Sequence, residues 1–298
     1  MRISFLHKIA IFVYLTLLSV FTVYSQDKIK ITPERNKDNS VTFYYEKFVP
    51  GSYSVTVEFS NMRNTHMSNY YGTIKNDNGI LFHLKPVNKN NAITFSYKTR
   101  FQRGITNPKV DSLFVYALPY LQGSSLKYRN LKYAGETYLD KEKPESWKSS
   151  GFVSDNDTVC AARRGIVVDI VNEYGIDTVN VKYTSKKNKI LIEHADGSFG
   201  SYSGFKKDNI FVEIGQVVDV QTPLGIAWEI AKEKQYFMSF FVSYYVQSKN
   251  QDKRESIYIT PCFWTEEGVK RLDSKNEYKV VITDDILNKE VKKKKKQK

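Results

Sequence analysis

Cysteine and histidine are the side chains of this 298-residue chain best suited to nucleophilic or metal chemistry, and both are scarce. There are two cysteines, Cys160 and Cys262, and four histidines, His7, His66, His83 and His194. A Cys160 thiolate with His194 as its base is one hypothesis, because such a nucleophile needs an imidazole or a positive charge beside it. The sequence identifies no Asn or Asp that would orient the imidazole. We therefore favour a structural His194 that flanks a turn and bonds to neighbouring backbone.

The N-terminus predicts export. A basic start, Met1–Lys8, precedes an apolar run, Ile9–Val23, and Ser25 offers a small residue before Gln26. These are the parts of a secretory signal peptide, here residues 1–25. The apolar run is shorter than the roughly 20 residues of a membrane-spanning helix, so we expect cleavage rather than anchoring. The mature protein would then act in the periplasm, in the cell envelope or outside the cell.

Export also bears on the two cysteines, since disulfides persist in oxidising compartments. A bridge between Cys160 and Cys262 is one interpretation. Two buried, unpaired thiols in strands are the other, and the sequence leaves both open.

The formal charge of +13 is concentrated at the chain ends. Residues 1–25 carry two basic residues and no acid, and residues 291–298 carry six lysines and no acid, which leaves +5 on the body. No nucleic-acid-binding motif accompanies this charge, so we expect no specific nucleic-acid partner. The Lys292–Lys296 run is predicted to be a solvated part of a basic disordered tail over 284–298. A weak hold on an anionic envelope polymer is the alternative.

The composition favours strands. Tyr (21) and Phe (18) dominate the apolar residues, and aromatic residues prefer strands. Hydrophobic residues at 41% and charged residues at 26% argue against a wholly disordered, collagenous or multi-span membrane chain. Short β-rich runs with polar, Gly, Asn or Pro breaks predict a small antiparallel sandwich over 26–112. A second all-β domain is expected over 113–283, with a long loop region over 120–158.

Five segments of the second domain follow one another at the spacing of a known family. They are VCAARRGIV (159–167), ILIEHADG (190–197), Tyr202, VEIGQVV (212–218) and Leu224-Gly225. Together they resemble the core of the lysostaphin-type (LytM-like) zinc endopeptidases. That family reads Val-x-Ala-Ala-x-x-Gly-x-Val, a strand ending in His-x-Asp-Gly, Tyr-x-His, Val-x-x-Gly-x-x-Val, Ile-Gly and a terminal His-x-His strand. The resemblance covers about 115–280 and implies an antiparallel β-core with a shallow groove.

In such enzymes two His and one Asp hold Zn²⁺, and two further His assist catalysis. A catalytic zinc site needs three protein ligands and an open position for an activated water. This chain departs at each compared position: Tyr-x-His reads Tyr202-Ser203-Gly204, and His-x-His reads Phe237-Met238-Ser239. Ser150 falls where the upstream Asp is expected, and there is no histidine between His83 and His194. The resemblance therefore implies a degenerate member that has no catalytic residues and binds no zinc cofactor.

What remains is a degenerate groove that could still bind a ligand. Its expected lining residues are Tyr202, Gly204, Phe237, Ser239 and Phe241. The aromatic run of Phe237, Phe240 and Phe241 is most simply core filling, and a cleft that grips a glycan or peptide is the alternative.

These observations give one leading function and two rivals. The leading hypothesis is an exported, non-catalytic pseudo-peptidase that binds peptidoglycan or regulates a cell-wall hydrolase. The first rival is an active metalloendopeptidase that cleaves peptidoglycan cross-links with replacement ligands such as Asp155, Asp157 or Asp196. A carboxylate set without imidazole suits Ca²⁺ or Mg²⁺ better than Zn²⁺. The second rival is a basic secreted binder that acts through its tail.

Overall fold

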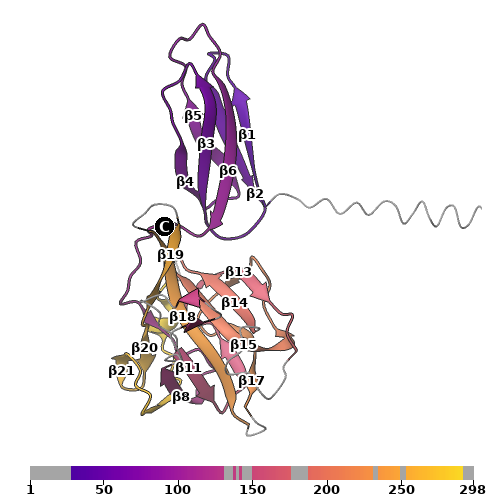
Figure 1. Cartoon of the computed structure of the whole chain (residues 1–298). Coiled ribbons are helices and arrows are strands. Elements are labelled where there is room, and N and C mark those ends of the chain that lie inside the picture. Colours follow the sequence, from indigo (N-terminus) through magenta and orange to yellow (C-terminus); the bar gives the residue numbers. More distant parts are fainter. Residues whose placement is uncertain are drawn as a thin grey trace, which may run out of the picture.

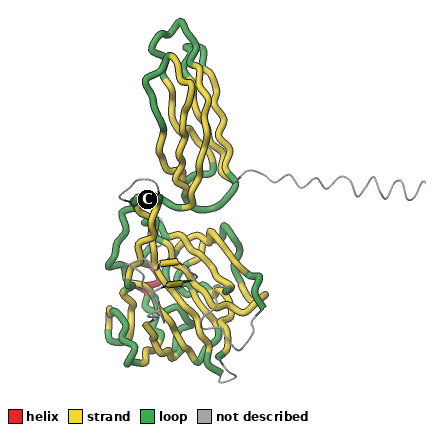
Figure 2. Tube along the Cα trace, viewed as in Figure 1, coloured by secondary structure: helices red, strands yellow, loops and turns green. Residues whose placement is uncertain are grey.

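The structure is a computed structural model that describes residues 28–130, 137–138, 141–142, 150–175, 187–230, 234–248 and 253–290. Within these residues the chain is almost entirely strand, and its sheets are antiparallel apart from one short parallel pairing (Figures 1 and 2). The predicted all-β class is therefore confirmed. No helix in the described part is long and apolar enough to cross a bilayer. The predicted signal peptide and the Lys292–Lys296 run lie outside the described residues.

The N-terminal domain is a small sandwich of two three-stranded sheets. One sheet has the order β1-β2-β5 and the other β4-β3-β6. The strands are β1 (Ile29–Arg35), β2 (Val41–Lys47), β3 (Tyr53–Arg63), β4 (Tyr70–Ile74), β5 (Asn78–Leu84) and β6 (Thr94–Arg103). Alternation along β3 buries Val55 and Val57 while their neighbours stay partly exposed, as expected for a sheet with one face in a core. Stacked Phe43 and Phe82 rings, 4.5 Å apart, lie in that core.

The C-terminal domain is built on one eleven-stranded sheet. Its main path runs β16-β13-β14-β15-β17-β18-β11-β8-β22, with β12 on β17 and β19 on β18. These strands are β8 (Ser125–Asn130), β11 (Ser150–Ser154), β12 (Thr158–Cys160), β13 (Gly165–Val171), β14 (Asn188–Glu193), β15 (Phe199–Ile210), β16 (Val217–Val218), β17 (Pro223–Glu229), β18 (Tyr236–Gln247), β19 (Arg254–Ile259) and β22 (Glu277–Lys279). A smaller sheet joins β7 (Val115–Tyr116), β20 (Cys262–Thr265) and β21 (Gly268–Lys270), and β9 (Thr137–Tyr138) pairs with β10 (Lys141–Glu142).

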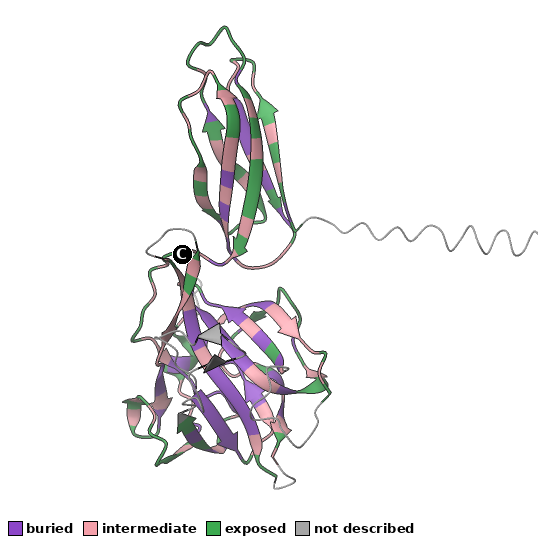
Figure 3. Ribbon diagram, viewed as in Figure 1, coloured by how far each residue is buried: buried purple, intermediate pink, exposed green. Residues whose placement is uncertain are grey.

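The core of this domain lies under one face of β15 and β18. Tyr202 and Phe240 sit opposite each other on these strands, with ring centroids 4.8 Å apart, and both are fully buried. Figure 3 shows long buried stretches along the strands of this domain. Burying large apolar side chains is the main stabilising contribution to such a core.

Two sequence predictions fail in this domain. The expected loop region over 120–158 contains β8 and β11, which are both strands of the main sheet and carry the buried Leu126 and Phe152. The expected disordered tail over 284–298 begins with the short helix α2 (Asp284–Asn288), in which Ile286 is buried. Tertiary packing accounts for β8, β11 and α2, which the local polarity of these segments did not predict.

The two domains touch end to end (Figure 1). Arg103 at the end of β6 forms an ion pair of 3.2 Å with Asp169 on β13. The Arg254 guanidinium donates to the backbone carbonyl oxygens of Arg103 and Gly104, at 2.9 and 3.3 Å. These contacts fix the end of the sandwich against β13 and β19.

Candidate functional site

The segments 202–204 and 237–239, predicted to face one groove, lie on neighbouring strands. β15 pairs with β18 so that Ser203 is opposite Ser239. The two hydroxyl oxygens are 2.8 Å apart, within hydrogen-bond distance. The structure thus brings the segments together and places two serines where they meet.

Strand alternation then divides the predicted groove residues between two faces. Tyr202 is opposite Phe240 and faces the core, where its hydroxyl accepts a hydrogen bond of 2.9 Å from the Ala162 N–H. Burial raises the pKa of the Tyr202 hydroxyl, so it stays protonated. Tyr202 is therefore a core residue and does not line the groove, because side chains one position apart on a strand point to opposite faces.

The opposite face carries a cross-strand row of three small residues that ends in an arginine on the fourth strand. Ser203 on β15 is opposite Ser239 on β18, Ser239 is opposite Gly151 on β11, and Gly151 is opposite Arg129 on β8. Residues paired in this way share a face of the sheet. Ser239 is largely buried, whereas Arg129 is exposed at the rim. We call this set the serine row.

Apolar side chains flank the serine row along β18. Phe237 is opposite Val153 on β11 and Trp228 on β17. Phe241, two positions beyond Ser239, packs its ring against Tyr258 at 5.4 Å. The face therefore combines hydroxyls in the middle, aromatic rings on both sides and a cation at its edge. Among its described residues this face contains neither an acid–base pair nor a ligand set for a metal.

Gly204 occupies a strained position that a larger residue would disturb. Asn188 of β14 is opposite Phe205 and Lys189 is opposite Ser203, so Gly204 is the extra residue of a β-bulge. Its φ of +112° lies in the region that favours glycine, and a Cβ there would be 2.9 Å from the carbonyl oxygen of Phe237. The glycine at the position of a family histidine thus has a backbone reason, which the sequence did not reveal.

Ser150, at the expected Asp position, faces away from the serine row. It is opposite Phe240 and is buried on the core side of β11. The hydrogen of Gly151, rather than any side chain, fills the place on β11 beside Ser239.

The replacement carboxylates lie in two separate turns. Asp155 accepts hydrogen bonds from Ser125 and Ser154, and Asp157 accepts one from Thr158, near the β11–β12 turn. Asp196 lies in the β14–β15 turn. In the part of the chain that the structure describes, no group of three or more His, Cys, Asp or Glu residues could hold a metal ion.

The environments of Cys160 and His194 oppose a nucleophilic pair. Burial raises the pKa of the Cys160 thiol to about 12, so it stays protonated. Burial and the nearby Arg163 charge hold the pKa of His194 well below its usual range. The neutral His194 donates from Nδ1 to the carbonyl oxygen of Arg164 at 2.9 Å, and its Nε2 has no partner among the described residues. This is the expected turn-flanking role.

Both cysteines are buried free thiols, so the structure contains no Cys160–Cys262 bridge. Cys160 lies on β12 beside β17, whereas Cys262 lies on β20 beside β7.

A buried arginine organises the surroundings of His194, and the sequence did not predict it. The Arg163 guanidinium donates to Glu290, with a shortest distance of 2.7 Å, and to Asp196 at 3.0 Å. It also stacks 3.6 Å above the ring of Phe114. Arg163 therefore joins the segment after β12, the β14–β15 turn and the residues after α2.

Comparison with known proteins gives little beyond this geometry. No protein-family model and no curated protein matches the chain. A solved structure described as a novel M23 metalloprotease, pseudoalterin from deep-sea, is similar in part. The match covers 57% of this chain and 96% of that chain, at 14% sequence identity and a TM-score of 0.28. A likeness of this size defines no activity for the present chain.

Proposed function

We propose that this chain is an exported, non-catalytic relative of lysostaphin-type endopeptidases that binds peptidoglycan or regulates a cell-wall hydrolase through the serine-row face. The observation that carries the proposal is that Ser239, where the resemblance expects a metal ligand, is opposite Ser203 on β15 and Gly151 on β11, so neither neighbouring strand places a ligating side chain beside it. The order and spacing of the sequence segments between 159 and 225 support the relationship to this family. The residues of the serine-row face argue against zinc-dependent hydrolysis.

The chemical argument concerns what serine and phenylalanine lack. Zinc sites in proteins use Cys, His, Asp or Glu, and a neutral hydroxyl is a poor substitute. Phe237 can neither donate nor accept a proton, so it cannot replace a general acid or base, whose loss costs roughly 10²–10⁴ in rate. We therefore infer that the protein works without zinc and without hydrolysis.

The same face supports binding of peptides that carry carboxylates. Arg129 ends the serine row at an exposed position, and Lys127 is exposed two residues before it. Guanidinium groups bind carboxylates through charge-assisted hydrogen bonds. Phe241 and the paired hydroxyls of Ser203 and Ser239 would contact the uncharged parts of a peptidoglycan stem peptide.

The alternative is an active metalloendopeptidase with replacement carboxylates. The ion pair between Asp196 and Arg163 argues against this, because a ligand would first have to leave a buried cation. A separate contribution from the tail is also proposed, in which the Lys292–Lys296 run attracts an anionic envelope polymer.

Co-sedimentation with purified peptidoglycan sacculi tests binding, and elemental analysis tests the metal. We expect the protein to pellet with sacculi, Arg129→Ala and Phe241→Ala to weaken this roughly tenfold, and zinc to be well below one per chain. Arg271→Ala, at another exposed arginine of the same domain, is the matched control and should bind normally. Stoichiometric zinc with chelator-sensitive muropeptide cleavage would overturn the pseudo-enzyme proposal. If Arg129→Ala and Phe241→Ala bind sacculi as well as the wild type does, the serine-row face is not the binding site.

A further inference from the structure

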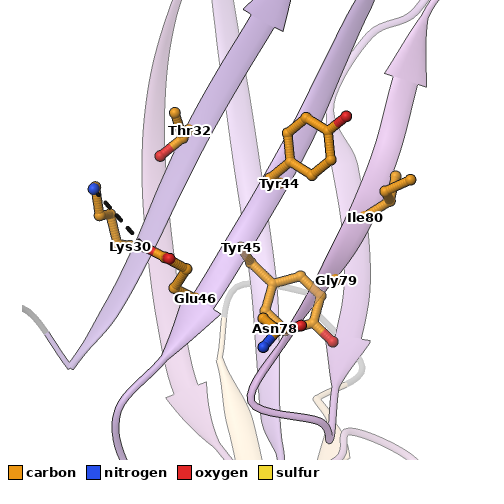
Figure 4. A pocket seen from close by; sticks show the side chains of 8 residues that line it. All are labelled: Lys30, Thr32, Tyr44, Tyr45, Glu46, Asn78, Gly79 and Ile80. Carbon is orange, nitrogen blue, oxygen red and sulfur yellow. Dashed lines mark ion pairs between the residues drawn. The ribbon is translucent and has the colours of Figure 1, made fainter.

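A hollow of about 550 Å³ lies on the outer face of the β1-β2-β5 sheet, far along the chain from the serine row (Figure 4). Two cross-strand rows form its surface. In the first, Thr32 is opposite Tyr44, and Tyr44 is opposite Ile80. In the second, Lys30 is opposite Glu46, and Glu46 is opposite Asn78. The face therefore presents six side chains in a regular two-by-three array.

The first row supplies an apolar platform. The Tyr44 ring is only half-buried and contacts no other ring among the described residues. Ile80 beside it is 54% exposed, unusual for an isoleucine in a strand. In Figure 4 both side chains stand on the open side of the sheet. An aromatic ring with a polar tip and an exposed aliphatic neighbour is a surface that favours amphipathic ligands.

The second row supplies hydrogen-bonding groups whose charges cancel. Lys30 Nζ lies 3.8 Å from Glu46 Oε2, and both side chains are more than half exposed. The Asn78 side chain forms no hydrogen bond with any described residue. Ammonium, carboxylate and amide together offer donors and acceptors in several directions at no net charge. The ligand that matches them is polar and uncharged.

The next row along the same sheet provides a contrast. There the Thr42 hydroxyl is 3.0 Å from His83 Nδ1 and accepts a hydrogen bond of 2.9 Å from Asn36. Thr42 is buried, so these polar groups satisfy one another within the protein. The hollow does not extend to this row and is confined to the end of the sheet around Tyr44 and Glu46.

The backbone of the middle strand is not available to a ligand that lies over Tyr44. β2 is paired with β1 on one side and with β5 on the other, so its N–H and C=O groups are already used. A peptide that binds by adding a strand needs a free edge, and the free edges of this sheet belong to β1 and β5, at the two sides of the hollow rather than over Tyr44. Recognition must come from side chains alone.

We propose that this face binds a neutral oligosaccharide, with one pyranose ring stacked on Tyr44. The apolar C–H face of a pyranose matches the aromatic platform, and its ring of hydroxyls matches Asn78, Glu46 and Thr32. The proposal is independent of the function proposed for the serine row.

An array of neutral oligosaccharides, chitohexaose and cellohexaose included, tests this with the purified protein, followed by titration calorimetry of the best binder. We expect Tyr44→Ala to weaken binding roughly tenfold or more, as for other aromatic anchors, and Asn78→Ala to weaken it less. Tyr44→Phe should keep most of the affinity because it retains the ring. Tyr71→Ala is the matched control: Tyr71 is 72% exposed on β4 of the other sheet and should not contribute.

Each other outcome overturns the proposal. These are no binding to any neutral oligosaccharide, equal binding by Tyr44→Ala, equal loss in Tyr71→Ala, or binding to a peptide array instead. Tyr44→Ala should unfold at the same temperature as the wild type, so that a loss of binding is not a loss of folding. If it is less stable, Asn78→Ala, which is expected to bind more weakly, and Tyr44→Phe, which is expected to bind nearly normally, test the site instead. Arg129→Ala and Phe241→Ala should bind the oligosaccharide normally, which separates this site from the serine row.

Discussion

The Glu193 carboxylate accepts two hydrogen bonds from Ser52, one from its backbone N–H at 2.9 Å and one from its hydroxyl. Glu193 ends β14 in the C-terminal domain, whereas Ser52 lies in the turn between β2 and β3 of the sandwich. Both residues are buried. A buried carboxylate costs free energy unless it is hydrogen-bonded, so this pair holds the domain junction in place.

The Glu193 pair should make stability depend on pH. Burial raises the pKa of Glu193 above its ordinary 4.5, although the Ser52 hydrogen bonds act in the opposite direction. The folded protein therefore holds this proton more tightly than the unfolded chain, and the contribution of Glu193 to stability declines as pH rises through the raised pKa. Glu193→Gln does not titrate, so its free energy of unfolding should rise relative to the wild type across this window. Urea denaturation from about pH 4 to 8 measures the difference. A difference that is flat or falls with pH contradicts the prediction.

Gly51→Ala should weaken the same junction. Gly51 has a φ of +82°, and a Cβ there would be 2.5 Å from Glu193 Oε2. Gly123→Ala is a matched control, because its φ of +87° is similar and nothing lies within 4 Å of the added Cβ. The cost of placing a residue with a Cβ in this left-handed backbone conformation is roughly 1–2 kcal/mol in both variants. In urea denaturation Gly51→Ala should lose clearly more free energy of unfolding than Gly123→Ala. Equal losses would show that the Glu193 side chain moves away from the added Cβ without loss of stability.

Arg163→Met should be among the most destabilising single substitutions. It leaves Asp196 and Glu290 without the buried guanidinium that both contact. Removing one partner of a buried ion pair typically costs about 3–5 kcal/mol. Arg164→Met is the control, since the neighbouring Arg164–Asp219 pair is largely exposed and such pairs contribute roughly 0–1 kcal/mol. Similar losses in both variants would contradict a special role for Arg163.

Acid should weaken the same cluster. Burial alone would raise the pKa of Asp196, but hydrogen bonds from Ser198 and the Arg163 charge outweigh it and lower the pKa below 3.8. The stability that Asp196 contributes is therefore present above 3.8 and is lost as pH falls through the lowered value. Asp196→Asn should be less stable than the wild type near neutral pH, and the gap should close in acid. Unfolding curves in acidic buffers measure the gap, and one that widens in acid would contradict this.

Local signals in the sequence predicted the strands that end in tight turns. Asp-Gly is a common hairpin-turn pair, and Gly197 of Asp196-Gly197 has a φ of +85° in the turn between β14 and β15. β8 was missed although Leu126 and Tyr128 alternate with exposed Lys127 and Arg129. Its pattern is short and its charged face resembles a loop, so only its pairing with β11 and β22 reveals the strand.

The tertiary features of the site had no local signal. Arg163 and Glu290 are 127 positions apart, and nothing near either residue indicates the other. The bulge at Gly204 depends on the register between β14 and β15, which a single sequence does not specify. The resemblance did predict that the segments 202–204 and 237–239 lie side by side, as they do on β15 and β18. The spacing of motifs along a chain indicates which strands pair, which composition alone does not.

Both thiols should be free and unreactive in the folded protein. Cys160 is completely buried, and burial raises the pKa of its thiol to about 12, so the reactive thiolate is scarce. Iodoacetamide should label neither cysteine in native buffer and both after unfolding without reductant. Mass spectrometry counts the added groups. If labelling requires reductant, the Cys160–Cys262 bridge forms in the exported protein.

Rebuilding the family's histidines should fail first at position 204. Gly204 is the bulged residue of β15 with a φ of +112°, and a Cβ would be 2.9 Å from the Phe237 carbonyl oxygen. Such a backbone conformation costs about 1–3 kcal/mol for a residue with a side chain. Gly204→His should therefore be destabilised beyond the control Gly215→His, whose φ is +96° with nothing within 4 Å of the added Cβ.

Adding Phe237→His and Ser239→His should still give no zinc enzyme. The triple variant would have imidazoles on β15 and β18, but β11 offers only Ser150, which faces the core, and Gly151, which has no side chain. A catalytic zinc needs three protein ligands with an open position, and two of those ligands would still be missing upstream. Elemental analysis and muropeptide digestion check this, with urea denaturation to confirm folding. If the folded triple variant binds about one zinc per chain and cleaves muropeptides, the upstream ligands are not required and the prediction is wrong.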